Sequence, residues 1–461
     1  MARRAQTNDP ILEAKLATLK AAITKTQPFA SGIVPASTSD LTLFYGKDKN
    51  ARRIENIAEA TAEEIADLAA ACDPAKFGLN DQNVLDESYR KAGQLNASQF
   101  CSTFDLRNSG IIEKVRDELI TQSGLKYTTR AELYNLNVYG PGSFFKAHKD
   151  TPRAESMFGS LVIALPYPHE GGGLALRDDD REWVFNFADD FKDEAGNLTI
   201  PYVVFYSDTE HEVLPVTAGY RITITYNLYR ESYSLGDPVS NTLENFNDLE
   251  VAFENLLADK TFLPDGGHLG FGLHYQYPFD KNDKDALKKI LNYLKGKDAK
   301  LSYTCDQLEL KVVPHLLFQD GLTTGGLWWS NGSGAVLIDR VPNLQKAYIE
   351  NGSASYYFAE QYKGKIIKKN RDYEDDPSTE EVKVHWVVGP NARTKMDAAY
   401  TVYGNEAATA FNYGCVCLIV TVPPYGQSPR ARAVDAERPV ANEKDDEQEK
   451  VAVDPGEPSN S

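Results

Sequence analysis

The chain has few cysteines and no long apolar run, and each of these features excludes one class of protein. Five cysteines occur among 461 residues and none forms a Cys-x-x-Cys pair, so a disulfide framework is not expected. No stretch approaches the ~18 consecutive apolar residues of a membrane helix. The N-terminal segment lacks the continuous apolar run of a secretory signal. We therefore expect a cytoplasmic or nuclear protein with no membrane association.

Basic residues are also scarce relative to acidic ones. Lys and Arg number 49 against 67 Asp and Glu, which gives a formal net charge of −18. Such a charge repels phosphate backbones, so nucleic acid is not an expected partner. Aromatic residues are abundant, with 25 Tyr and 20 Phe, and they favour strands over helical bundles. The length suits about two or three domains. The oligomeric state stays open.

The period of the apolar residues changes along the chain. Helical spacing at 11–24, 53–75 and 110–122 predicts an N-terminal helical support region, residues 1–125. From Glu132 the period becomes two, and short strand-like runs follow one another to about residue 230. Many short strands separated by turn residues predict a sandwich or barrel. We therefore expect a mainly β fold with flanking helices (α+β), whose core, residues 126–232, is a jelly-roll or cupin-like barrel.

The remaining chain is predicted to contain three further parts. They are a helical connector at 233–264, a second β-rich and non-catalytic domain at 265–426, and a disordered acidic tail at 427–461. When Gly219 is aligned with Gly414, Glu406 falls opposite His211 and Val416 opposite Arg221. This pattern favours a second, degenerate barrel. Generic similarity between β-sandwiches is the alternative.

The run His148-Lys149-Asp150, followed by His211, carries the main chemical signal. Two histidines and one carboxylate can occupy one face of an octahedral Fe(II), which leaves three positions for a chelating co-substrate and O₂. His148 and Asp150 are two residues apart, so both side chains can point to one side of an extended segment. The alternative is a surface-loop histidine with Asp150 in a turn.

Arg221 follows His211 by ten residues and lies within the strand-like run YRITITYNLY. A buried arginine is costly without a partner. A dicarboxylate co-substrate would supply that partner through a bidentate fork. The alternative is an arginine on an edge strand, in solvent or paired with Glu210 or Glu212.

Together these residues resemble the prolyl 4-hydroxylase-like branch of the Fe(II)/2-oxoglutarate dioxygenases, over about 130–230. The features that carry the resemblance are Tyr139-x-Pro-Gly, His148-x-Asp150, the glycines 171–173, His211 and Arg221. The resemblance implies a double-stranded β-helix with His148, Asp150 and His211 as iron ligands. It implies Arg221 as partner of the 2-oxoglutarate C5 carboxylate and Tyr139 as a hydrogen-bonding partner of that co-substrate. Thr223 is a further candidate for holding it.

Two positions depart from the pattern of the prolyl hydroxylases. Phe145 stands where that branch often has tyrosine, on the side that faces substrate. Arg221 stands where many of its members have lysine. Both departures weaken the expectation of a peptidyl-proline substrate. Asp150 favours hydroxylation over halogenation, because halogenases of the superfamily lack this carboxylate.

The leading hypothesis is an Fe(II)- and 2-oxoglutarate-dependent hydroxylase of a protein or peptide side chain, prolyl being one candidate, with O₂ as oxidant and ascorbate as reductant. The acidic segment at 178–182 favours a basic substrate. The alternatives are a hydroxylase of a small metabolite and a non-catalytic cupin-like binding module. A nucleic-acid demethylase is disfavoured by the charge balance.

Overall fold

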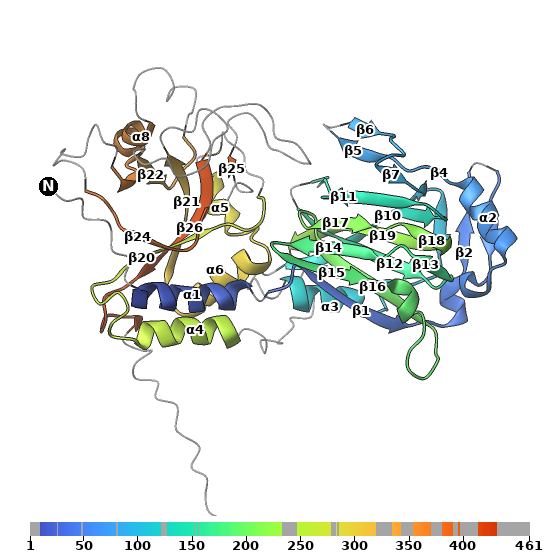
Figure 1. Cartoon of the computed structure of the whole chain (residues 1–461), viewed down its shortest axis with the longest axis horizontal. Helices are drawn as coiled ribbons and strands as arrows, with labels where there is room; N and C mark the ends of the chain where they lie inside the picture. Colours follow the sequence, from blue (N-terminus) through green and yellow to red (C-terminus); the bar gives the residue numbers. More distant parts are fainter. Residues whose placement is uncertain are drawn as a thin grey trace, which may run out of the picture.

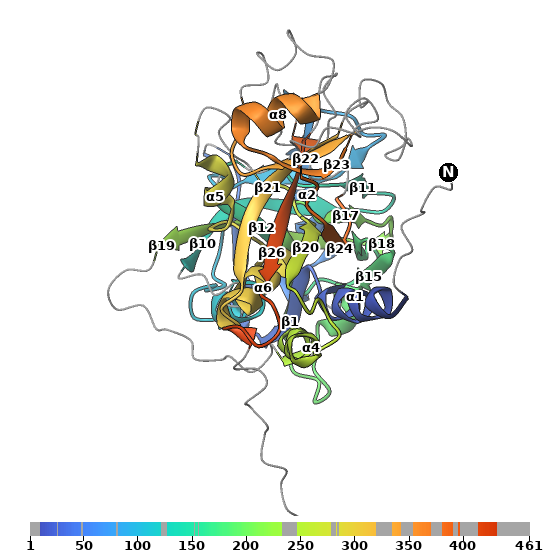
Figure 2. The ribbon, with the colours of Figure 1, turned by 90° about the vertical axis from the view of Figure 1, so that its left-hand side faces the viewer.

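The computed structural model describes residues 10–430 except 25, 48, 80–81, 121–126, 152, 155, 233–246, 278–282, 284, 320–333, 343–353, 370–379, 391–394 and 397–413. Two β-rich halves lie end to end along the long axis of the molecule (Figures 1 and 2). None of the described helices combines the length and apolarity that a membrane span needs.

Two antiparallel sheets face each other in the first half. The larger sheet contains, in spatial order, β1 (Phe29–Pro35), β16 (Thr199–Tyr206), β12 (Met157–Leu165), β19 (Arg221–Ser232), β10 (Tyr127–Tyr139), β8 (Gly93–Asn96) and β4 (Asp73–Pro74). The smaller contains β15 (Arg181–Phe185), β14 (Leu174–Asp178), β17 (Glu210–Val213), β11 (Phe144–His148) and β7 (Arg90–Lys91). This arrangement confirms the mainly β fold with flanking helices.

One apolar core lies between the two sheets and positions the strands that carry the site. Val162 and Phe205 of the larger sheet pack in one cluster with Leu176 and Val213 of the smaller. A second cluster covers the outer face of the larger sheet and includes Ile65 and Leu68 of α2 (Ala62–Ala71). The central strands β12 and β16 are thus buried on both faces of the larger sheet.

The first 125 residues contain more strand than their helical spacing predicts. Helices form at α2, where Thr61 and Glu64 make a capping box, and at α3 (Ile111–Val115), which continues as a π-turn to residue 120. Short strands precede α2, namely β2 (Leu43–Tyr45) and β3 (Arg52–Ile54), and others lie between the two helices, among them β5 (Phe77–Leu79), β6 (Gln82–Val84) and β9 (Phe100–Ser102). Runs of two to four residues are too short for a period of two to show in the sequence.

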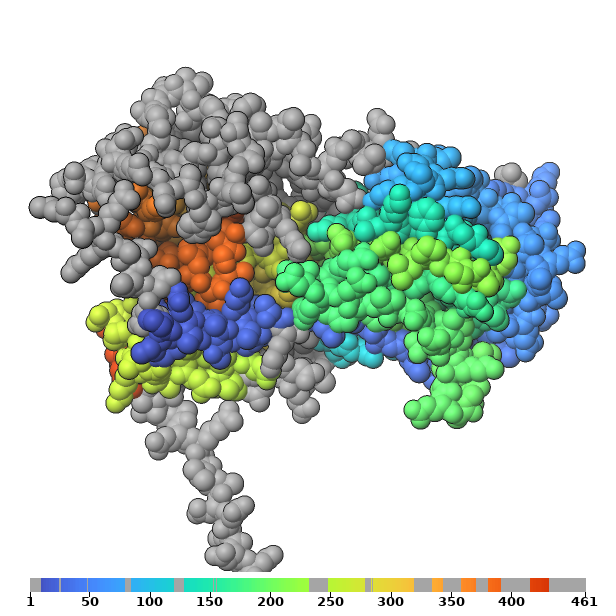
Figure 3. Space-filling model, in the orientation of Figure 1, coloured from blue at the N-terminus to red at the C-terminus, as the bar shows by residue number. Residues whose placement is uncertain are grey.

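Helix α1 (Pro10–Thr24) packs on the second half of the molecule, although the sequence places it in the support region of the first. Its Leu19 and Ile23 share a core with Leu249 and Phe253 of α4 (Asn247–Ala258). Lys15 Nζ also lies 2.5 Å from Asp259 Oδ2. The dark-blue surface of α1 lies against the yellow-green surface of α4 in Figure 3. The chain therefore crosses from one half to the other before β1.

The second half contains a seven-stranded sheet with helices against it. Its strands are, in order, β23 (Lys365–Lys368), β22 (Ala335–Ile338), β21 (Lys311–Gln319), β26 (Gly414–Val422), β20 (Gly267–Gly272) and β24 (Val384–Val388), with β25 (Lys395–Met396) beside β26. The helices are α4, α5 (Ala286–Ile290), α6 (Gly296–Gln307) and α8 (Ala354–Tyr362). No facing sheet occurs among the described residues of this half, and Glu406 lies outside them, so the second barrel stays a prediction.

The packed part of the chain extends past Gln427, where the sequence indicates the start of a tail. Arg430 is 0% exposed. All three of its guanidinium nitrogens donate to backbone carbonyl oxygens, among them those of Leu257 and Phe262. One arginine thus anchors residues at the start of the segment that the composition predicts to be disordered. The rest of the predicted tail lies outside the described residues.

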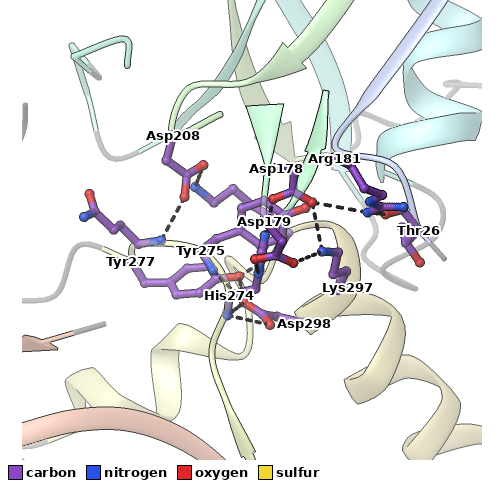
Figure 4. A network of polar contacts seen from close by, with 12 residues as sticks. Thr26, Asp178, Asp179, Arg181, Asp208, His274, Tyr275, Tyr277, Lys297 and Asp298 are labelled. Atoms are coloured by element: carbon purple, nitrogen blue, oxygen red, sulfur yellow. Dashed lines mark hydrogen bonds and ion pairs between the residues drawn. The ribbon is translucent and has the colours of Figure 1, made fainter. Parts of the chain in front are cut away.

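A buried polar network joins the two halves (Figure 4). Asp178, at the end of β14, accepts hydrogen bonds from Lys297 Nζ at 2.8 Å and lies 2.5 Å from His274 Nε2. Asp208, in the turn before β17, pairs with Lys295 Nζ at 2.8 Å. Both aspartates lie near His211: Asp178 ends the strand β14, which pairs with the His211 strand, and Asp208 precedes His211 by three residues. The second half therefore holds two of the loops that form the end of the barrel.

Protonation of Asp178 at low pH should weaken the contact between the two halves. Burial alone would raise the pKa of Asp178, but the hydrogen bonds and charges of His274 and Lys297 outweigh burial and lower its pKa. A carboxylate whose pKa is lowered by folding stabilises the fold above its unfolded pKa of about 3.9 and loses that contribution as the pH falls. We expect the free energy of unfolding to fall more steeply below about pH 5 in the wild type than in Asp178→Asn.

The same substitution should destabilise the protein at neutral pH. Breaking a buried pair costs about 3–5 kcal/mol, and the cost should lie near or below 3 because Lys297 retains Asp179 at 3.0 Å. The control is Asp180→Asn, in the same turn but exposed, with an expected change within about 0.5 kcal/mol. Chemical denaturation between pH 3 and 8 measures both effects. Equal pH dependence in the wild type and Asp178→Asn would contradict the prediction.

Candidate metal centre

His148 and His211 are brought together by strand pairing. His148 ends β11, His211 lies in β17, and the two residues are direct partners in the antiparallel ladder. Their ring centroids are 4.1 Å apart. Asp150 follows β11, and its backbone N–H donates to Ser207 O at 2.9 Å. Ligand atoms of the three side chains lie within 4.8 Å of one another, so one ion can contact all three.

Hydrogen bonds to backbone carbonyls orient both imidazoles. Nδ1 of His148 lies 2.8 Å from Lys146 O, and Nδ1 of His211 lies 3.0 Å from Thr209 O. A carbonyl oxygen only accepts, so Nδ1 carries the proton in each ring and Nε2 keeps its lone pair. Partners of this kind fix the tautomer and ring orientation of metal-binding histidines.

The carboxylate of Asp150 is also oriented by a neighbour. Ser160 Oγ, on β12, donates to Asp150 Oδ2 at 2.5 Å. The other oxygen, Oδ1, lies 3.6 Å from His211 Nε2. One carboxylate oxygen is thus held by the barrel wall while the second faces the histidines. Sequence reasoning missed Ser160, although its spacing of two from Val162, on the inward face of β12, is the signal that identifies it.

Aromatic packing keeps His148 in its ligating form. The Phe145 ring stacks on the His148 ring with centroids 3.5 Å apart. Burial and the neighbouring His211 imidazole lower the pKa of His148 well below its ordinary value. A neutral imidazole is the form that binds a metal. Phe145, the departure from tyrosine in the sequence, therefore packs on a proposed ligand.

Arg221 is a buried cation that forms no ion pair with any of the described residues. It is 1% exposed, and its Nε has no hydrogen-bond partner. Its guanidinium carbon lies 5.2 Å from the centre of the Tyr139 ring and 5.4 Å from that of Phe187. Burial lowers the pKa of Arg221 to about 10, so it stays protonated at neutral pH. Such an arrangement fits an anion that arrives with a ligand. It excludes the solvent-exposed alternative.

Tyr139 and Thr223, the two further candidates, lie beside Arg221. Tyr139 is the direct partner of Arg221 in the β10–β19 ladder, and Thr223 pairs with Asn137. Tyr139 and Thr223 are 3% and 1% exposed, and both line the same cavity as Arg221. Gly172 packs beside this arginine, because a Cβ built there would lie 2.9 Å from Arg221 Cδ and 2.8 Å from Val216 Cγ2. The glycine in the sequence motif thus makes room for the arginine side chain.

All six residues line one cavity of about 370 Å³, the size of a small-ligand pocket. The donor set of two imidazoles and one carboxylate fits Fe(II) with three open positions. The unpaired guanidinium fits a dicarboxylate such as 2-oxoglutarate. Sequence reasoning missed Asn137, Arg90 and Arg153, which also line the cavity.

A second group of possible ligands, Asp178, Asp179 and His274, occurs at the junction. Lys297 Nζ lies 2.8 Å from Asp178 and 3.0 Å from Asp179. A lysine ammonium at this place already neutralises the carboxylates and would repel a divalent ion. We therefore interpret this group as an ion-pair network.

Residues 134–229 match the family model of the 2OG-Fe(II) oxygenase superfamily. The chain is similar to the solved structure of a prolyl-4-hydroxylase from Pseudomonas putida, with 18% identity, a TM-score of 0.28, and coverage of 46% of this chain and 100% of that one. It is also similar to a prolyl hydroxylase from Trichoplax adhaerens in complex with a hypoxia inducible factor oxygen degradation domain peptide fragment, with 14% identity, a TM-score of 0.27, and coverage of 49% and 94%.

A third similar structure is an oxidoreductase of the 2OG-Fe(II) oxygenase family from Burkholderia pseudomallei. The identity is 15%, the TM-score is 0.22, and the match covers 50% of this chain and 96% of that one. No curated protein shows significant sequence similarity to the chain. Similarity at this level does not identify a substrate.

Proposed function

We propose that this chain, an oxygenase of the 2OG-Fe(II) superfamily that uses Fe(II), 2-oxoglutarate and O₂, hydroxylates a C–H bond of a protein or peptide side chain. The overall reaction is R–H + 2-oxoglutarate + O₂ → R–OH + succinate + CO₂. The observation that carries the proposal is the convergence of His148, Asp150 and His211 in a cavity that also contains Arg221, which has no ion-pair partner among the described residues. The resemblance to prolyl 4-hydroxylases makes a prolyl side chain one candidate.

Each residue has a definite part in this proposal. Nε2 of His148, Nε2 of His211 and Oδ1 of Asp150 would hold Fe(II), which when bound supplies the site that activates O₂. Arg221 would bind the far carboxylate of 2-oxoglutarate, with Tyr139 and Thr223 beside it. The apolar rings of Phe145 and Phe205 stack or tilt against the histidines and exclude water from one side of the ligands. Ascorbate would keep the iron reduced.

Product analysis tests the proposal and its alternatives. The full-length protein is incubated with Fe(II), 2-oxoglutarate and ascorbate, and succinate release is measured with pools of peptides or of small metabolites. A mass gain of one oxygen in a peptide supports the proposal, while a gain confined to metabolites supports the small-molecule alternative. If no pool and no uncoupled reaction releases succinate, and His148→Ala binds Fe(II) as tightly as the wild type, the hydroxylase proposal fails and the binding-module alternative stands.

A further inference from the structure

The cavity is basic although the protein is acidic. The cationic side chains that line it are Lys76, Arg90, Lys149, Arg153 and Arg221, and among the described lining residues the single carboxylate is Asp150. The whole chain carries a formal charge of −18. Fe(II) and 2-oxoglutarate carry equal and opposite charges, so the cavity keeps its excess of positive charge when both are bound. A basic cleft in an acidic protein concentrates anionic ligands.

Arg90 is the buried member of this set that the co-substrate does not explain. It lies on β7 and is 9% exposed. Its guanidinium donates to Lys76 O at 2.5 Å and to Asn137 Oδ1 at 2.8 Å, while Nε has no hydrogen-bond partner. Both acceptors are neutral. Within the described part of the chain no Asp or Glu forms an ion pair with Arg90, so its charge is buried without compensation.

Other buried cations in this molecule are compensated. Lys297 pairs with Asp178 and Lys295 with Asp208, both at 2.8 Å. Arg430 donates from all three nitrogens to backbone carbonyls. Arg90 and Arg221 differ from all three: in both arginines Nε has no hydrogen-bond partner among the described residues, and the guanidinium lines a ligand cavity in which it has no counter-charge. Both arginines are expected to obtain that charge from what binds there.

The two arginines lie beside different positions along β10 and therefore cannot bind the same carboxylate. Arg221 lies against Tyr139, while Arg90 bonds Asn137, two residues earlier on the same face of β10. Two residues of a strand span about 7 Å, so one carboxylate cannot occupy both places. Arg90 also lies over the Phe145 ring, 4.5 Å from its centroid, and that ring stacks on His148. Arg90 is therefore next to the proposed iron ligands.

We propose that Arg90 binds a carboxylate of the primary substrate, and that the hydroxylated molecule is therefore acidic. This inference rests on the proposed hydroxylase function. Lys76 O and Asn137 hold the guanidinium in place, and Asn137 Nδ2 in turn donates to Thr225 Oγ1 at 3.3 Å. A guanidinium fixed in this way binds a carboxylate with little loss of side-chain entropy.

The basic substrate that the acidic segment 178–182 suggests loses its support in the structure. Asp178 and Asp179 pair with Lys297, and Glu182 pairs with Arg177 at 2.9 Å. These carboxylates already have partners within the protein, and those of Asp178 and Asp179 face the junction shown in Figure 4. The charge that remains uncompensated near the proposed iron site is positive.

Matched pools of ligands test the inference on the full-length protein. One pair of pools contains peptides that differ only in Asp and Glu against Asn and Gln. The other contains small carboxylic acids against their primary amides. Binding to the Fe(II)- and 2-oxoglutarate-loaded protein is measured without O₂, and oxygen incorporation is measured with it. We expect acids to bind about 10- to 100-fold more tightly than the matched amides, the range of a charge-assisted hydrogen bond. The reacting pool shows whether the acid is a peptide or a small molecule.

Arg90 variants then locate the effect. Arg90→Gln should weaken binding of the reacting acid by about 10- to 100-fold, with unchanged Kd values for Fe(II) and 2-oxoglutarate, and Arg90→Lys should restore part of it. The control is Lys91→Gln, the next residue of β7, which is exposed and does not line the cavity. It should behave as the wild type.

Several outcomes would overturn the inference. One is equal binding of acids and amides while uncoupled succinate release proves the enzyme active. Another is a loss in Arg90→Gln that falls on the Kd of 2-oxoglutarate instead of that of the substrate. A third is oxygen incorporation only into a single-stranded oligonucleotide included as a separate arm. If succinate release is absent throughout, the hydroxylase proposal has failed first, and this inference falls with it.

Discussion

Asp150→Ala is expected to abolish coupled and uncoupled turnover of 2-oxoglutarate and to weaken Fe(II) binding by more than about a hundredfold. Loss of a partner that only orients a metal ligand typically costs about 10- to 100-fold in metal affinity. Loss of a ligand should cost more, since Asp150 is the only carboxylate among the described residues that line the cavity. Ser160→Ala, which removes the hydrogen bond to Asp150 Oδ2, should fall within that smaller range.

Thermal unfolding separates loss of the metal from loss of the fold. A ligand that binds only the native state raises Tm, and at a fixed ligand concentration the rise grows with the logarithm of its affinity. Apo Asp150→Ala should unfold near the Tm of the apo wild type, and Fe(II) added without O₂ should raise Tm in the wild type alone. Asp180→Ala, an exposed aspartate of the same half, is the matched control. An Fe(II)-induced rise in Tm of equal size in Asp150→Ala would remove this residue from the metal centre.

The barrel could be predicted from the sequence because its strands carry their own signal. Strands β10, β12, β16 and β19 are each eight residues or longer, long enough for strand-like runs between turn residues to be recognised. Tyr139 lies in β10, and Arg221 and Thr223 lie in β19. The His148-x-Asp150 motif follows β10 closely in the sequence. The structure brings together each of the residues that this local pattern singled out.

Features that depend on packing between distant segments could not be predicted in this way. Arg90 is 47 residues from its partner Asn137 and belongs to a two-residue strand, so neither spacing nor period marks it. The periodicity of α1 predicts a helix but does not indicate which half of the molecule it packs on. The charge of the cavity is likewise hidden, because the composition of the whole chain has the opposite sign. In each case the cause is tertiary contact that a linear pattern does not encode.

Arg221 should show opposite effects on stability and on co-substrate binding. Replacing even a buried ion pair with apolar side chains of similar volume is often neutral or stabilising, by up to about 4 kcal/mol, and a buried charge without its partner contributes less to stability than a pair. We therefore expect the apo protein with Arg221→Met to be at least as stable as the wild type. The same variant should raise the Kd for 2-oxoglutarate by about 100-fold or more, since losing one partner of a buried charge pair costs about 2–5 kcal/mol. Arg221→Lys should retain part of the affinity.

A gentler substitution tests the same site without removing the charge. Gly172 has φ +70°, and a Cβ there would lie 2.8 Å from Val216 Cγ2 and 2.9 Å from Arg221 Cδ, whereas Gly196 has φ +84° with nothing within 4 Å of a built Cβ. Gly172→Ala and Gly196→Ala therefore share the backbone strain, of the order of 1 kcal/mol, but only the first displaces the arginine. We expect Gly172→Ala alone to raise the Kd for 2-oxoglutarate, by about tenfold.

Titration calorimetry with 2-oxoglutarate, on protein loaded with Fe(II) and kept free of O₂, measures these affinities, and denaturation of the apo protein measures stability. The strained control removes the objection that any glycine substitution near the barrel loosens it. A buried guanidinium kept for folding would produce the reverse pattern: Arg221→Met would lose several kcal/mol of stability while its affinity for 2-oxoglutarate stayed near that of the wild type. That result would contradict the proposal that Arg221 binds a carboxylate of 2-oxoglutarate.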